Sequence, residues 1–202
     1  MKPLDLISIA TFLLIVCSCN EKKETVSTLV DKGVDLVNEH KFGEAIPYYS
    51  KAIKLNPRVQ LTYYDRGIAY MQLEEYSKAF EDFNKIMELK TDNGVIKEYT
   101  LEGFGEVPYN DALYNRAIVK ANMDSLKSAY GDFQRLLADN YSEKSSCYAW
   151  IGFLFIKSRK PETACEYFEK AKLSAIIEGD RQNADKMINT YCLDSNTIQS
   201  SN

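Results

Sequence analysis

The sequence has little of what most catalytic and nucleic-acid-binding sites require. Its 202 residues include one histidine, one tryptophan, five prolines and nine glycines. His40 has no carboxylate partner, phosphate loop or metal cluster near it, so we expect a solvated turn residue and no enzyme, cofactor or metal. The net charge is -4, with lysine and arginine interleaved among acids, which argues against a basic face for nucleic acid. Few helix breakers and little β-branched alternation predict helices.

One apolar run stands at the N-terminus. From Leu6 to Val16 it spans eleven residues, fewer than the roughly 20 that cross a bilayer as a helix, and it is typical of a signal-peptide core. Its end, "VCSC", resembles the lipobox of bacterial lipoproteins. This resemblance implies that Cys19 is lipidated, in preference to Cys17. A plain secreted protein and a Cys-x-Cys metal site are the alternatives.

Asn20 follows the lipidated position, where an aspartate would favour the inner membrane. The lipoprotein resemblance therefore implies a lipid-anchored protein of the bacterial cell envelope, at the outer membrane on its periplasmic or surface side. Residues 1–18 would be the signal peptide and residues 19–25 a tether. An extended tether of this length reaches at most roughly 20 Å, which would keep the folded part and its partner close to the membrane.

A two-helix pattern then repeats with a period of 34 residues. Apolar residues stand at positions 4, 8 and 11 of each unit and at positions 20, 24 and 27, the spacing of two amphipathic helices. We expect positions 8 and 20 to be small because the helices cross there. The matching pairs in units 26–59 and 60–93 are Gly33 and Gly67, Ala45 and Ala79, and Tyr49 and Phe83.

Two further units occupy residues 110–178, after an insertion at 94–109. They keep the register at Ala117, Ala129, Phe133, Gly152, Ala164 and Phe168. The repeat resembles the tetratricopeptide repeat (TPR). That resemblance implies an all-α, right-handed α-solenoid of about four helix hairpins. We expect a capping helix at 179–192, N-capped by Asp180, after a last repeat helix that runs on to Gly179, and a disordered tail at 193–202.

Two segments carry further expectations. The insertion contains three glycines and a proline, with apolar residues such as Phe104 that need burial, so it should fold over one edge of the solenoid, either as packing or as ligand contact. The acids of "LEEY" (73–76) and "FEDF" (80–83) are expected to face water.

In the TPR family the first helices of successive units line a concave groove, and some members grip a peptide carboxylate there with lysine, asparagine and arginine. That clamp is absent from this sequence. The resemblance implies a groove that also includes Val30, Asp31 and Val34, and in which Tyr64 and Tyr114 are stacked. The predicted partner-binding residues are Tyr64, Asp65, Ile68, Tyr114, Asn115, Ile118, Trp150 and Phe153.

Because aromatic residues are enriched at interfaces, we expect a protein or peptide partner with apolar anchors and some positive charge. Packing of the same residues between neighbouring first helices is the open alternative. The sequence thus predicts a membrane-anchored TPR scaffold. The alternative is a structural or assembly subunit that uses the convex face or the 94–109 insertion.

Three cysteines lie beyond the predicted signal peptide and lipidation site. Cys165 lies on the last repeat helix and Cys192 at the end of the cap that should pack on it, which makes them the best pair for a disulfide. Buried thiols are the alternative.

Overall fold

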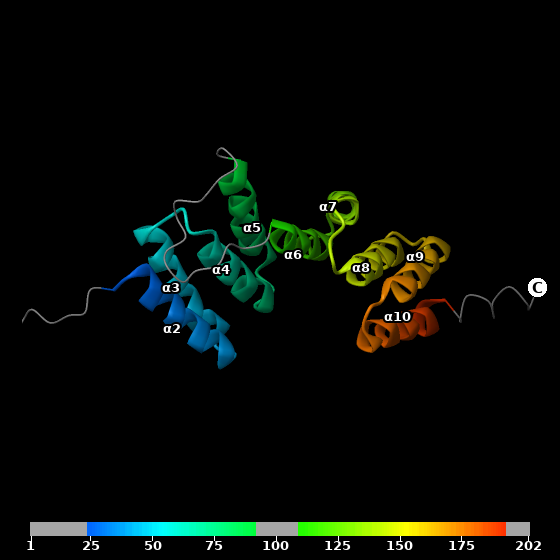
Figure 1. Ribbon diagram of the computed structural model, residues 1–202, viewed down its shortest axis with the longest axis horizontal. Helices are drawn as coiled ribbons and strands as arrows, with labels where there is room; N and C mark the ends of the chain where they lie inside the picture. Colours follow the sequence, from blue (N-terminus) through cyan, green and yellow to red (C-terminus); the bar gives the residue numbers. More distant parts are fainter. Residues whose placement is uncertain (1–23, 92–108, 193–202) are drawn as a thin grey trace, which may run out of the picture.

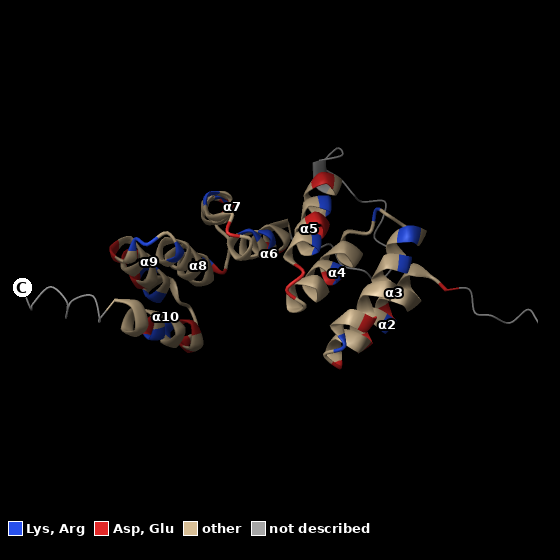
Figure 2. Cartoon of the chain, turned by 180° about the vertical axis from the view of Figure 1, so that it is seen from behind, with Lys and Arg blue, Asp and Glu red and all other residues tan. Residues whose placement is uncertain are grey.

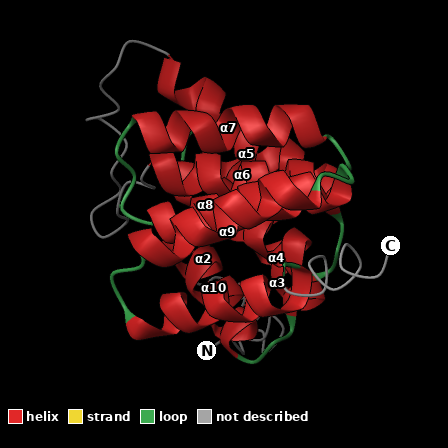
Figure 3. Ribbon diagram, turned by 90° about the vertical axis from the view of Figure 1, so that its right-hand side faces the viewer, coloured by secondary structure: helices red, strands yellow, loops and turns green. Residues whose placement is uncertain are grey.

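The computed structural model describes residues 24–91 and 109–192, and within these ranges every regular element is an α-helix (Figure 1, Figure 3). The helices follow one another along the long axis of an elongated molecule. Their bounds are α2 Val26–Asn38, α3 Phe42–Leu55, α4 Gln60–Gln72, α5 Tyr76–Thr91, α6 Tyr109–Asn122, α7 Leu126–Ala138, α8 Lys144–Lys157, α9 Pro161–Ser174 and α10 Glu178–Tyr191.

The helices form four hairpins and a final single helix. The backbones of successive first helices (α2, α4, α6, α8 and α10) lie close to one another, whereas within the described ranges those of the second helices (α3, α5, α7 and α9) lie farther apart, with side chains such as Tyr130 and Tyr167 bridging them. The first helices therefore form the inner, concave layer. Helices α5 and α6 pack directly, so the stack continues across residues 92–108, which lie outside the described ranges together with the expected insertion. The predicted all-α solenoid of TPR-like hairpins with a capping helix is confirmed.

The second helix of every hairpin contributes the same three positions to the core. Residues at positions 20, 24 and 27 are at most 1% exposed in all four units. These residues are Ala45, Tyr49 and Ala52; Ala79, Phe83 and Ile86; Ala129, Phe133 and Leu136; and Ala164, Phe168 and Ala171. The predicted register is confirmed.

The small residue at position 8 accommodates an aromatic ring. A β-carbon on Gly33 would lie 2.5 Å from the Tyr49 ring, and one on Gly152 would lie 2.3 Å from the Phe168 ring. The expectation that position 8 faces the alanine at position 20 therefore needs correction, because the closest neighbour is the ring at position 24. This ring sets the separation of the two helices.

Replacing Gly152 with alanine tests this contact. Because the added methyl group would overlap the Phe168 ring, we expect Gly152→Ala to lower the free energy of unfolding by about 1–3 kcal/mol. A β-carbon added to Gly131, within α7, would meet no neighbouring side chain within 4 Å, so Gly131→Ala should instead raise it by about 0.5–1 kcal/mol. Denaturant unfolding of both variants measures the difference, and equal effects would contradict the ring contact.

An arginine at position 7 links the second helices of hairpins one to three. The Arg66 guanidinium donates two hydrogen bonds to Asp82, at 2.8 and 2.7 Å, and a third to the Ser50 hydroxyl on α3 at 3.0 Å. Asp82 is only 3% exposed. The expectation that the acids of "FEDF" face water is therefore wrong for Asp82, although Glu81 is exposed.

The same arrangement recurs one hairpin further along. Arg116 donates to both carboxylate oxygens of Asp132, at 3.0 and 2.9 Å, and to the Asn84 side chain on α5 at 3.0 Å. Lys120 adds a bond of 2.7 Å to Asp132, so position 11 of the third unit is an ion-pair residue rather than the apolar one expected. Bidentate pairs of this kind fix geometry as well as adding energy.

The fourth hairpin joins the third through aromatic rings instead. Ile151 occupies the place of the arginine, and the Trp150 ring lies parallel to Phe133, with 6.4 Å between centroids and an interplanar angle of 11°. Lys157 reaches back to the third hairpin, bonding the Ala121 carbonyl at 2.9 Å and Asp124 at 2.8 Å.

The C-terminal boundary differs from the prediction. Helix α9 ends at Ser174 rather than Gly179, because Ala175 has an extended backbone (φ -67°, ψ 123°). Helix α10 begins at Glu178 with Ile177 as its N-cap, so Asp180 lies in the first turn and does not cap the helix. Acidic residues in a first turn stabilise a helix through its dipole. Pro161 is the first residue of α9, a position at which proline is favoured.

A disulfide joins Cys165 on α9 to Cys192 after α10, with Cα atoms 5.8 Å apart, which confirms the predicted pair. A cross-link over 27 residues contributes roughly 3 kcal/mol by restricting the unfolded chain. It holds α10 against the last hairpin. Cys147 is a buried free thiol, and its burial raises its pKa to about 12.

Candidate partner-binding groove

The concave face carries two rows of side chains from the first helices. The residues at position 9, Val34, Ile68, Ile118 and Phe153, form an apolar row, and those at position 6, Asp31, Asp65, Asn115 and Trp150, form a mixed row. Within these rows Val34 is 39% exposed, and Ile68, Ile118 and Phe153 are partly buried. We call this surface the groove. Val30, expected here, is only 2% exposed and belongs to the core.

Two predicted groove residues are linked across a hairpin junction. The Asn115 amide on α6 donates to the Tyr64 hydroxyl on α4 at 3.0 Å, and also to the Asp111 carbonyl at 3.0 Å. The Tyr141 hydroxyl donates to the Asp111 carboxylate at 2.8 Å. This chain of polar contacts holds the wall of the groove between the second and third hairpins.

The predicted stacking of Tyr64 on Tyr114 is not what the structure shows. Each tyrosine instead packs edge-on against the position-24 ring of its own hairpin, Tyr64 on Phe83 and Tyr114 on Phe133, both at 6.0 Å between centroids. The reason is geometric, because the hairpin's own ring is nearer than the next tyrosine along the groove. These two tyrosines therefore have a packing role and leave only part of their surface in the groove.

The last two predicted groove residues, Trp150 and Phe153, lie at the C-terminal end of the groove. Phe153 contacts the rings of Phe168 at 5.7 Å and Tyr191 at 5.9 Å, and Trp150 lies beside Phe153 at 6.0 Å. Tyr191 comes from α10, so the capping helix takes part in this end of the groove.

Asp65 is an acidic residue of the groove with an unusual environment. Its side chain is partly buried, and no hydrogen bond or ion pair to its carboxylate occurs in the described ranges. Desolvation raises its pKa from 3.8 to about 6. An acid held away from water without a partner destabilises the fold.

Asp65→Asn is expected to stabilise the protein. Since the folded-state pKa lies above the unfolded one, the folded state binds more protons between about pH 4 and 6, and the free energy of unfolding should rise as pH falls through that window. At about pH 7 the substitution should add about 1–3 kcal/mol and should flatten this pH dependence. Denaturant unfolding at several pH values measures both effects, and a destabilised variant would contradict the desolvated acid.

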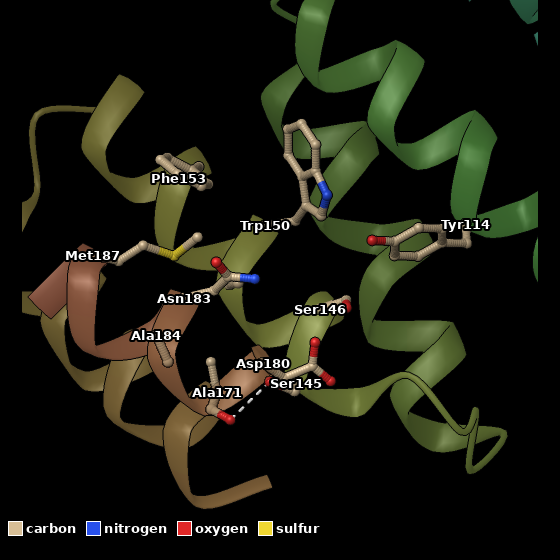
Figure 4. Close-up of a pocket in the computed structure, with 11 residues that line it drawn as sticks. Tyr114, Ser145, Ser146, Trp150, Phe153, Ala171, Asp180, Asn183, Ala184 and Met187 are labelled. Carbon is tan, nitrogen blue, oxygen red and sulfur yellow. Dashed lines mark hydrogen bonds between the residues drawn. The ribbon is translucent and has the colours of Figure 1, made fainter. Parts of the chain in front are cut away.

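Helix α10 closes the end of the groove into a pocket of about 240 Å³. Tyr114, Ser146 and Trp150 border it, and Figure 4 shows Asp180 and Asn183 of α10 pointing toward the same space. Burial raises the pKa of Tyr114 to about 12, against an opposing effect of hydrogen bonding by Ser146 and Trp150. Sequence reasoning missed Asp180 and Asn183, because Asp180 had been assigned to capping.

A catalytic or metal site would need histidine, cysteine or acidic side chains close together. His40 is exposed in the turn between α2 and α3 with a φ of 59°, as expected of a turn residue. No group of histidine, cysteine, aspartate and glutamate in the described ranges could hold a metal ion, and no described helix is long and apolar enough to span a membrane. Basic and acidic residues are intermixed along the helices of the hairpins (Figure 2).

The helix pairs, their register and the concave first-helix layer are those of the TPR fold. Residues 36–59 and 62–93 match the sequence profile of the Tetratricopeptide repeat, so these two stretches are tetratricopeptide repeats. Among curated proteins, the UDP-N-acetylglucosamine--peptide N-acetylglucosaminyltransferase of Giardia intestinalis is 46% identical over 50 residues, which are 25% of this chain and 3% of that enzyme. The chain spans only a small part of such relatives, for example 3% or 18% of their length.

Solved structures extend the similarity to most of the chain. A double mutant of MamA RS-1 matches with a TM-score of 0.61 and 18% identity, over 83% of this chain and 84% of that one. YrrB, a TPR protein with an unusual peptide-binding site, matches with a TM-score of 0.55 and 18% identity, over 86% and 88% of the two chains. These likenesses establish the fold.

Proposed function

We propose that this protein is a scaffold that binds a protein or peptide segment along its concave groove. The observation that carries the proposal is Asp65, an unpaired and partly buried carboxylate in a groove that also carries the partly buried Ile68 and Ile118. A segment with apolar anchors and a basic residue fits this surface. Its cation would remove the desolvation cost of Asp65 at the moment of binding.

The groove has the features of an interface rather than of a closed core. Its position-9 row is apolar, and part of each side chain remains exposed. Its position-6 row supplies the polar groups, from Asp31 to Asn115. Interfaces combine apolar centres with polar rims in this way. The fold shared with YrrB, whose structure contains a peptide-binding site, supports the same assignment.

Asp65→Asn tests partner binding in the groove without unfolding the protein, because that variant is expected to be more stable than the natural protein. Capture of partner proteins from an envelope extract, read by crosslinking and mass spectrometry, should fall about tenfold in Asp65→Asn. The matched control is Asp139→Asn, which removes an exposed charge after α7 and should leave capture unchanged. Equal capture by all three proteins would remove the groove proposal.

An assembly subunit that binds through its outer surface is the second candidate. Leu173, Ile176 and Ile177 are 83%, 86% and 62% exposed around the connection from α9 to α10, and clustered exposed apolar side chains are a feature of interaction sites. In the same capture assay, loss of binding in Leu173→Gln with full binding in Asp65→Asn would favour this alternative.

The proposal includes a lipid anchor at Cys19 that places the scaffold at the outer membrane of a bacterial envelope. It is supported by the apolar run and the "VCSC" sequence, both of which lie outside the described residues. Two or more acyl chains, at about 0.8 kcal/mol per buried methylene, hold a protein at a membrane almost permanently. Helix α2 begins at Val26, so only a short tether would separate the first hairpin from the lipid.

Mass spectrometry of the native N-terminus tests the anchor. The mature chain should begin at an acylated Cys19 and should partition into the membrane fraction. Cys19→Ala should abolish both acylation and membrane partitioning, whereas Cys17→Ala should keep them. An unmodified first residue, or acylation that depends on Cys17, would contradict the assignment.

A further inference from the structure

The pocket between α8 and α10 is chemically distinct from the rest of the groove. Its walls include three aromatic side chains, Tyr114, Trp150 and Phe153, together with the thioether of Met187. Among the residues that the structure describes, Asp180 is the only charged one that lines the pocket. Figure 4 shows the Asp180 carboxylate directed toward the space that Tyr114 and Trp150 border.

The Asp180 carboxylate has no cation of its own. It is partly buried, and no ion pair or side-chain hydrogen bond to it occurs in the part of the chain that the structure describes. Further along α10, Asp185 is already paired with Lys172 of α9 at 2.6 Å. A negative charge is therefore available at the mouth of an aromatic pocket.

Aromatic faces attract cations, with the strongest attraction at tryptophan. This protein places its own lysines over tyrosines elsewhere, for example Lys170 over Tyr167 at 4.5 Å and Lys32 over Tyr48 at 5.7 Å. Within the described ranges no lysine or arginine lies over Tyr114, Trp150 or Phe153. The pocket thus offers ring faces and a carboxylate, both of which favour a cation.

The pocket opens at the groove positions of the first helices. Trp150 and Phe153 occupy positions 6 and 9 of the fourth unit, which are the positions of the two rows that form the groove. A segment lying along the groove therefore reaches the pocket at its C-terminal end.

We infer that this pocket binds a lysine side chain of the partner segment, with the ammonium group beside Asp180 and the methylene stem against Trp150 and Tyr114. The inference rests on the proposed function, because the lysine belongs to the segment bound in the groove. A lysine fits better than an arginine. Its compact charge needs few acceptors, while a guanidinium presents five donors to a pocket whose only carboxylate is Asp180.

Trp150 is the only tryptophan of the chain, so its fluorescence reports on the pocket directly. The probes are acetyl-Ala-Ala-Lys-Ala-Ala-amide and twins in which norleucine or arginine replaces lysine. In the full-length protein the lysine peptide should change the fluorescence saturably, and both twins should bind about tenfold more weakly. Identical binding of lysine and norleucine peptides, or no change with any peptide, would overturn the inference. Tighter binding of the arginine twin would overturn the choice of lysine.

Asp180→Asn should weaken binding of the lysine peptide about tenfold, to the level of the norleucine twin. Glu178→Gln is the matched control, because it removes a negative charge from the same first turn of α10 and does not line this pocket. Its affinity should equal that of the natural protein. Unchanged affinity in Asp180→Asn would overturn the role of the carboxylate.

Two further results distinguish the lysine pocket from a site for free organic cations and from the groove proposal. If n-butylammonium binds as tightly as the lysine peptide and with the same dependence on Asp180, the pocket takes free organic cations, and the assignment to a partner segment is wrong. If Asp65→Asn loses partner capture while Asp180→Asn binds the lysine peptide normally, the groove stands and the pocket inference fails. The reverse pattern would keep the pocket and remove the groove.

Discussion

The fold depends on the fit of one aromatic ring against one small residue in each hairpin. Tyr49 over Gly33 and Phe168 over Gly152 leave no space for a β-carbon, so the two helices can approach only in one register. That register turns positions 6 and 9 of the first helix toward the concave side. The placement of Asp65, Ile68 and the other groove residues therefore follows from a contact on the opposite side of the same helices.

A second constraint joins the hairpins to one another. Arg66 and Arg116 each bond an aspartate within their own hairpin and a polar residue on the preceding second helix. Breaking the Arg66 pair would leave the buried Asp82 carboxylate uncompensated, whereas Asp132 would keep its bond to Lys120. These contacts fix the pitch of the outer layer, while the bond from Asn115 to Tyr64 fixes the inner one. The groove between the first three hairpins is thus preorganised.

Much of the fold and of the groove was predictable from the sequence, and the wrong predictions have physical causes. Periodicity identified the core positions and, through the position of the cap, the bridge between Cys165 and Cys192. Periodicity could not distinguish the exposed Glu81 from the buried Asp82. The two adjacent acids differ only because Asp82 bonds an arginine that lies 16 residues earlier in the sequence. The recurrence of Arg66 with Asp82 as Arg116 with Asp132, at a common offset of 50, was the available signal. Groove residues were placed by register, but the edge-on packing of the tyrosines depends on ring contacts within each hairpin, and the pocket beside Asp180 depends on how α10 meets the last hairpins.

The junction between the third and fourth hairpins lacks the arginine link. There Trp150 lies flat on Phe133, with Ile151 in the arginine's place. Parallel rings tolerate lateral sliding at little energetic cost, whereas a bidentate ion pair holds one geometry. This joint is also held by the hydrogen bonds of Lys157 to Ala121 and Asp124 and by the contact between the Tyr130 and Tyr167 hydroxyls. The disulfide between Cys165 and Cys192 ties α10 to α9, so the position of the cap at the end of the spiral follows from the geometry of this one joint.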